Sequence, residues 1–269
     1  ASESDLEELW ARRSSGHVGG RAAPEPVLRV IDELEDLLSE RPSDLAASWK
    51  LLRALHFYGE YVLADEDEEL AVFERARALA DAARAALHAR LELAADERDP
   101  DRIARAFAVA QRRGAIDRID AASVYFYSAI HWGLWGERTG RMRAARQGVA
   151  GRIRDWAEAV VRLDERLADA GGHRFLGRLH TEAPKIPLFT GWVDRRAAVA
   201  HLKRACELAP EEPANQVYLA DALLRFVPER TEEAPRRLED VVATPPRPHN
   251  VVEDAASIEE AKRLLASTS

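Results

Sequence analysis

Apolar residues recur three and four positions apart along almost the whole chain, and no segment alternates apolar and polar residues with a period of two. Such spacing places the apolar side chains on one face of an α-helix. The pattern predicts helices over residues 5–13, 25–40, 44–64, 67–95, 101–112, 119–136, 141–169, 173–182, 194–209, 213–226, 231–243 and 256–267. We therefore expect an all-α fold built as a superhelical stack of antiparallel helix pairs.

One type of helix carries three apolar residues at positions i, i+4 and i+7. A proline follows at position i+12. The copies are Val30, Leu34, Leu37 and Pro42; Ala198, Leu202, Ala205 and Pro210; and Ala234, Leu238, Val241 and Pro246. A fourth copy, Ile153, Ala157 and Val160, has Glu165 in place of the proline. Because proline cannot continue a helix, we expect these helices to end shortly after their apolar face.

A second type of helix carries anchor residues at positions i, i+3 and i+7. Its copies are Trp49, Leu52 and His56; Val124, Tyr127 and His131; His173, Leu176 and His180; and Gln216, Leu219 and Leu223. The residue after the middle anchor is Arg53, Ser128, Gly177 or Ala220. Three of these four are small, so we expect a partner helix to approach closely at that point.

The alternation of the two helix types predicts one α-helical repeat domain over residues 1–269. Within it, residues 1–23 form an N-terminal helix and a flexible linker that contains Gly16, Gly19 and Gly20, and residues 24–269 form the helix pairs. Self-similarity of this kind is the sequence signature of a repeat architecture.

The alternation resembles tetratricopeptide repeats, whose first helix carries W-x2-L-G-x2-Y and whose second carries A-x3-F-x2-A-x4-P. The best copies are Phe175–Gly177 followed by Ala198–Pro210, and Leu219–Ala220 followed by Ala234–Pro246. The first copy departs from the family by an insertion, Pro184–Val193, between its two helices. The chain therefore resembles a divergent subfamily of this repeat.

A narrower resemblance, covering nearly the whole chain, is to the T-component of TRAP transporters. It is carried by the segments Leu9–Arg13, Leu52–Glu60, Ser128–Trp135, Phe175–His180, Glu182–Pro184 and Thr190–Val193. The resemblance implies a periplasmic accessory protein, lipid-anchored in its full-length form and homotrimeric. It also implies a solute-binding (P-component) partner and a small organic acid or hydrophobic ligand. The alternative is a general adaptor, in the cytoplasm, that holds a partner protein's peptide in its concave groove.

In a stack of this kind the first helix of each pair lines the concave face. The positions beside the anchor residues then line a ligand-binding groove, for which the candidates are Tyr58, Tyr125, Trp132, Arg174, Arg178, His180 and Glu182. The same register adds Lys50, Phe57, Asp221 and Arg225. Aromatic walls with a few convergent charges suit a small organic ligand or a peptide carboxylate.

A structural reading of the same residues stays open. The aromatic side chains are equally compatible with packing between helices, and the arginines with solvated positions. Arg178 also stands four residues before Glu182, so the two can form an ion pair within one helix.

The net charge, the cysteine content and the length of the apolar runs exclude several classes of function. The 39 basic and 47 acidic residues give a net charge of -8, and arginine is scattered along the helices, so we expect no nucleic-acid partner. A single cysteine, Cys206, excludes an intrachain disulfide or a cysteine metal cluster. No apolar run reaches the roughly 20 residues of a membrane-spanning helix, so we expect no transmembrane segment.

Catalytic and metal-binding patterns are missing from the sequence. It contains no G-x-S-x-G, no H-E-x-x-H and no Gly-rich phosphate loop. His56, His131 and His180 occupy equivalent repeat positions, which lie about 8–10 Å apart in neighbouring helices, too far for one zinc ion. We therefore expect a non-enzymatic protein with no catalytic residues, no cofactor and no metal.

Overall fold

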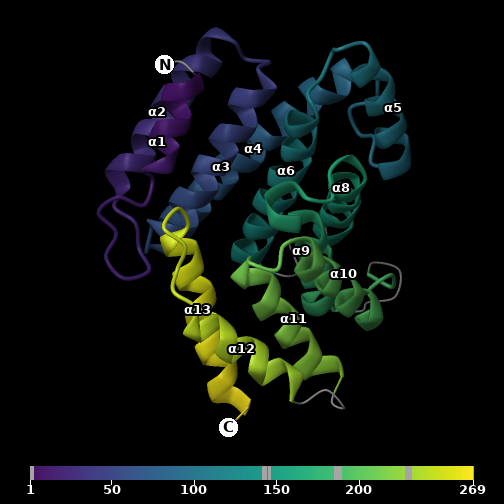
Figure 1. Ribbon diagram of the computed structural model, residues 1–269. Coiled ribbons are helices and arrows are strands. Elements are labelled where there is room, and N and C mark those ends of the chain that lie inside the picture. The colour runs from purple at the N-terminus through teal and green to yellow at the C-terminus, as the bar shows by residue number, and fades with distance from the viewer. Residues whose placement is uncertain (1–2, 141–143, 145–146, 185–189, 228–231, 269) are drawn as a thin grey trace. The chain divides into compact units, whose positions relative to one another are not determined.

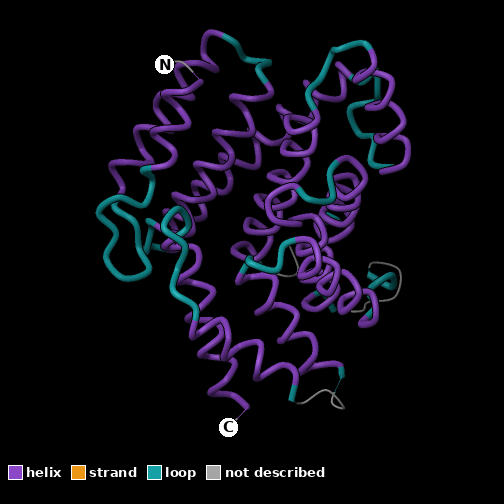
Figure 2. Tube along the Cα trace, viewed as in Figure 1, coloured by secondary structure: helices purple, strands orange, loops and turns teal. Residues whose placement is uncertain are grey.

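The computed structural model describes residues 3–140, 144, 147–184, 190–227 and 232–268. Within these residues the regular secondary structure is helical, apart from an isolated bridge between Val18 and Arg21. Figure 2 shows the helices following one another with loops between them. The all-α fold and the packing of successive helices in pairs are confirmed.

The contacts within the chain divide it into two compact units, Ala1–Asp164 (unit 1) and Glu165–Ser269 (unit 2), which are described separately. The single repeat domain expected over the whole chain stays a prediction.

Unit 1 consists of helices that each pack against the next one or two along the chain. They are α1 (Glu3–Ala11), α2 (Pro24–Glu40), α3 (Leu45–Tyr61), α4 (Glu66–Arg90), α5 (Pro100–Arg112), α6 (Arg118–Thr139) and α8 (Val149–Leu163), labelled in Figure 1. Four of them start at an aspartate whose carboxylate accepts hydrogen bonds from the first-turn N–H groups: Asp44, Asp65, Asp99 and Asp117. Aspartate at this position satisfies donors that the helix itself leaves free.

Unit 2 consists of α9 (Leu167–Glu182), α10 (Arg195–Leu208), α11 (Pro213–Phe226), α12 (Glu233–Ala243) and α13 (Val251–Thr268). The repeated apolar triplets form its core, because the following residues are all buried: Ala198, Leu202, Ala205, Ala234, Leu238 and Val241. Pro210 and Pro246 lie just beyond the ends of α10 and α12, as the spacing predicts.

Gly177 sets the distance between α9 and α10. A Cβ atom placed on Gly177 would overlap the Leu202 side chain and would lie 3.2 Å from the carbonyl oxygen of Ala198. The expectation that a small residue here permits a close approach of the partner helix is confirmed for this position.

Several helix boundaries differ from the prediction; α4, for example, ends at Arg90 rather than at residue 95. The helix expected over 141–169 is wrong at its C-terminal end, because α8 ends at Leu163 and Asp164 is extended. The expected start of this helix falls on residues 141–143 and 145–146, which lie outside the described residues. The final helix begins at Val251 rather than at residue 256.

A left-handed turn interrupts the start of α9, a few residues after α8 has ended. Ala168, Asp169 and Ala170 have φ values of 51°, 56° and 61°, a region that residues with a side chain adopt at a cost of roughly 1–2 kcal/mol each. The Arg174 guanidinium donates hydrogen bonds of 3.1 Å to the carbonyl oxygens of Ala168 and Asp169. The chain thus leaves helical geometry here at residues that are neither glycine nor proline.

Candidate functional site

Charged and polar side chains of α9 and α11 meet along one line, here called the α9–α11 seam. Its members are Arg174, Arg178, Glu182, Asn215, Asp221 and Arg225. Residues four apart share a helix face, so the three α9 members point toward the same neighbour. The structure thus brings together Arg178 and Glu182 with two further residues of the predicted register, Asp221 and Arg225.

Asp221 holds the seam together. Its side chain is only 5% exposed, and its two carboxylate oxygens accept hydrogen bonds from Arg178 (2.9 Å) and Arg225 (2.8 Å). Glu182, which is 43% exposed, lies 3.0 Å from the guanidinium groups of both arginines. Two positive and two negative groups therefore balance each other, with the buried carboxylate fixing the positions of the exposed ones.

Arg178 is held from several sides. Besides its two carboxylate partners, its guanidinium carbon lies 4.8 Å from the centre of the Tyr218 ring. The ion pair with Glu182 within α9 is present, as the structural reading expects. The side chain remains 35% exposed, so part of the guanidinium still faces solvent.

Arg174 and Asn215 have a structural task at the N-terminal end of the seam. Asn215 is completely buried, and its amide group donates to the carbonyl oxygens of Asp169, Ala205 and Ala209 at 3.1–3.2 Å. Arg174 donates to the Asn215 side-chain oxygen at 3.0 Å. Together they stabilise the left-handed turn described above.

His180 lies in the interface between α9 and α10. Its Nδ1 accepts a hydrogen bond of 3.0 Å from the backbone N–H of Asp194, and its ring stacks on that of His201 at 6.1 Å. His201 in turn contacts His173, with 2.9 Å between their Nδ1 atoms. Burial, together with the two neighbouring histidines, lowers the pKa of His201 to about 4. Sequence reasoning missed this cluster because His201 lies outside the anchor positions.

Two of the predicted residues in unit 1 are core side chains of α6. Tyr125 has no exposed surface, and its hydroxyl shares a hydrogen bond of 2.8 Å with Nε2 of His88. Burial raises the pKa of Tyr125 above its ordinary value. Trp132 is 5% exposed and donates from Nε1 to Asp81 at 2.9 Å. Tyr58, on α3, is half-buried.

Trp132 belongs to a cluster of arginines stacked on indole rings, which sequence reasoning missed. Arg84 lies 4.0 Å from the ring centre of Trp156, Arg77 lies 4.3 Å from Trp135, and Arg152 lies 5.0 Å from Trp132. Such contacts stabilise a positive charge on an aromatic face. Burial lowers the pKa of Arg84, although an ion pair of 2.8 Å with Asp81 opposes this effect.

The family model of the TRAP transporter T-component matches residues 31–269 of the chain. The chain belongs to this family. No curated protein matches it. The resemblance seen in the sequence is confirmed, and the role that follows from membership is that of an accessory component of a TRAP transporter.

Within the described part of this T-component, no group of three or more His, Cys, Asp or Glu residues is placed to hold a metal ion. Among the helices that the structure describes, none has the length and apolar character needed to cross a bilayer.

The seven residues predicted for one groove fall into both units of the T-component. Tyr58, Tyr125 and Trp132 lie in unit 1, and the four others lie in unit 2. Within the set, Arg178 and Glu182 form an ion pair of 3.0 Å. A single cavity that includes all seven stays a prediction.

Proposed function

We propose that this T-component is a non-enzymatic periplasmic accessory protein that binds the solute-binding P-component of its transporter and a small organic or hydrophobic ligand. The observation that carries the proposal is the family match over residues 31–269. An accessory component acts through contacts with other components of its system, so the proposal requires a surface suited to protein binding.

The α9–α11 seam supports the partner half of the proposal. Arg178, Glu182 and Arg225 are each partly exposed, and buried Asp221 fixes the two arginines before any partner arrives. Side chains that are already ordered lose less conformational entropy on binding. Alternating charges also select a partner with the complementary pattern.

For the ligand, we keep the predicted groove residues but favour those that are exposed. Tyr58, Arg178 and Glu182 retain exposed surface, whereas Tyr125 and Trp132 are buried. An acidic ligand at Arg178 would have to compete with Asp221 and Glu182 for the same guanidinium. We therefore expect the exposed residues of the set, rather than the buried aromatic ones, to contact a ligand.

The homotrimer and the lipid anchor of the full-length protein remain part of the proposal through the family resemblance. Sedimentation equilibrium of the purified chain tests the trimer. A monomer mass at all concentrations would contradict it.

Solute uptake tests the accessory role in cells. Deleting the gene should abolish uptake of the radiolabelled solute of the TRAP system to which this chain belongs, and the wild-type gene should restore it. A double variant of the seam, Arg178→Glu with Arg225→Glu, should not restore uptake, because it replaces both exposed cations with anions.

The matched control for this uptake assay is Arg236→Glu, which reverses the charge of an exposed arginine on α12 that forms an ion pair with Glu232. This variant should restore uptake as well as the wild type. Uptake that continues unchanged in the deletion strain would overturn the proposed accessory role.

A further inference from the structure

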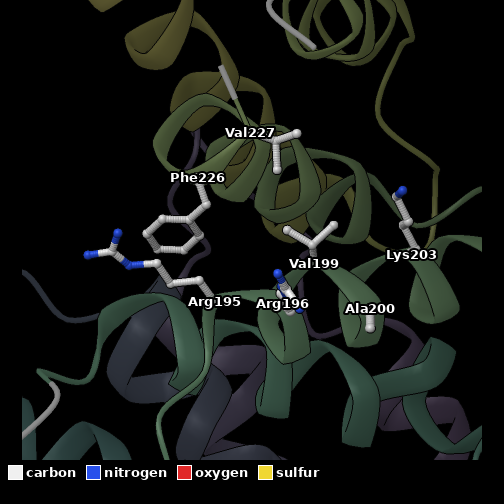
Figure 3. A pocket seen from close by; sticks show the side chains of 7 residues that line it. All are labelled: Arg195, Arg196, Val199, Ala200, Lys203, Phe226 and Val227. Carbon is white, nitrogen blue, oxygen red and sulfur yellow. The ribbon is translucent and has the colours of Figure 1, made fainter. Parts of the chain in front are cut away.

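Unit 2 contains a pocket of about 350 Å³ that the predicted groove does not include. It lies along α10 and the end of α11, and its lining residues are Arg195, Arg196, Val199, Ala200, Lys203, Phe226 and Val227 (Figure 3). Its volume is at the small end of the range for small-molecule sites.

The wall of the pocket is apolar. Phe226 and Val227, at the C-terminal end of α11, face Val199 of α10, as Figure 3 shows, and all three are half-buried. Ala200 adds a methyl group and leaves the adjacent surface open. An apolar body placed here would shield these side chains from water and would be stabilised by burial of its own apolar surface.

Three cations surround this apolar wall: Arg195, Arg196 and Lys203. None of the three forms an ion pair with a carboxylate among the described residues. Arg195 instead places its guanidinium carbon 5.3 Å from the ring centre of Phe226. The nearby Asp194 carboxylate is engaged in capping α10 through the backbone N–H of Arg196, at 2.8 Å.

Several other arginines of unit 2 do pair with carboxylates. Arg204, Arg237 and Arg247 each lie within 3.0 Å of a carboxylate oxygen. Among the residues that the structure describes, no carboxylate pairs with the three cations beside the pocket, so an anionic group placed there would meet positive charge.

The position of the two arginines on α10 does not serve helix stability. They occupy the first turn of α10, which carries no acidic residue, whereas the first turn of α4 carries four. The N-terminal end of a helix is itself positive, so cations there are unfavourable by a few tenths of a kcal/mol or more. An anionic ligand would remove this repulsion.

We propose that the pocket binds an organic carboxylate with an apolar body. The carboxylate pairs with the cations of α10, and the apolar body packs against Val199, Phe226 and Val227. This inference deepens the ligand half of the proposed function by naming a site and a chemical class. It does not depend on the α9–α11 seam or on the P-component.

Calorimetric titration of the full chain with octanoate tests the proposal, because octanoate combines one carboxylate with an unbranched apolar chain. We expect saturable binding of octanoate and none of octylamine, which has a similar chain and the opposite charge. Arg196→Gln combined with Lys203→Gln should weaken octanoate binding by about tenfold or more, since hydrogen bonds to charged groups are lost.

A second variant tests the apolar half and guards against misfolding. Ala200→Trp fills the pocket from an exposed helical position, so it should abolish octanoate binding while the helical circular dichroism stays unchanged. The matched control Arg236→Gln, which removes one exposed cation from the same unit, should bind octanoate as the wild type does.

Equal binding of octylamine, or wild-type affinity in the Ala200→Trp variant, would overturn the assignment, and so would absence of octanoate binding. The two proposals can fail separately. Octanoate binding by a chain that does not bind the P-component would contradict the proposed function and leave this site standing. Binding of the P-component without binding of octanoate would contradict this site and leave the proposed binding of the P-component standing.

Discussion

At the scale of single residues, His131 shows how burial creates a dependence on pH. Its ring is completely buried in α6, and Nε2 donates a hydrogen bond of 2.9 Å to the carbonyl oxygen of Leu52. Because burial disfavours the charged form, the pKa of His131 is lowered to about 4, from an ordinary value near 6.5. The unfolded chain therefore binds a proton between pH 6.5 and 4 that the folded chain does not.

This difference predicts that the free energy of unfolding falls as the pH drops from 6.5 to 4, by about 3 kcal/mol from this residue. His131→Gln, which can still donate to the Leu52 carbonyl, should flatten that dependence by a similar amount. Urea denaturation at a series of pH values measures it. The exposed His17→Gln is the control, and an equally steep dependence in His131→Gln would show that burial of this ring is not the cause.

The close contact at Gly177 predicts that a larger residue there lowers the stability of unit 2. Gly177→Ala should destabilise unit 2 by about 1–3 kcal/mol, because the added methyl group overlaps Leu202. Gly151→Ala, in α8, adds the same methyl group where no atom lies within 4 Å, and it should be neutral or stabilising by up to about 1 kcal/mol. Chemical denaturation compares the two. Equal effects would mean that the α9–α10 distance does not depend on Gly177.

At the scale of helices, the sequence predicts which face of a helix is buried better than it predicts where the helix ends. The triplet Ala198, Leu202 and Ala205 is buried as its spacing predicts, because the period of a helix fixes which residues share a face. The break after α8 was not predictable, since no glycine or proline occupies residues 164–170. The left-handed turn there is stabilised by Asn215, which lies far along the chain.

In the candidate site, contacts within one helix could be predicted from the sequence, whereas contacts between helices could not. The Arg178–Glu182 pair could be read from the sequence, because both residues lie one turn apart on one helix. The contacts of Arg178 with Asp221, and of Tyr125 with His88, depend on how separate helices pack. Spacing within one helix carries no information on these contacts. The sequence therefore left Tyr125 open as a groove residue or as a packing residue, and the structure places it in the core.

The seam itself predicts that binding and stability can be separated at Arg178. Arg178→Ala should lower the stability by no more than about 1 kcal/mol, because the side chain is partly exposed and Asp221 keeps Arg225 as a partner. Binding of the P-component should weaken by about 1.5–3 kcal/mol, the usual contribution of a hydrogen bond to a charged group. A melting curve and a titration on this one variant measure both quantities. Lost stability with unchanged binding would leave Arg178 a purely structural role.

At the scale of the whole molecule, the chain is an all-α accessory component of a TRAP transporter. Its two compact units each bury repeated apolar faces, and the charged seam and the cationic pocket both belong to unit 2. A protein of this kind affects transport through what it binds. The proposed role therefore depends most on a physical complex between this chain and the solute-binding component.

Sedimentation-velocity titration of the full chain with the purified P-component measures that complex most directly. We predict a saturable complex whose affinity falls at least about tenfold in the Arg178→Glu, Arg225→Glu double variant and is unchanged in Arg236→Glu. If the two proteins sediment independently up to the highest concentrations at which both stay in solution, the central claim is wrong.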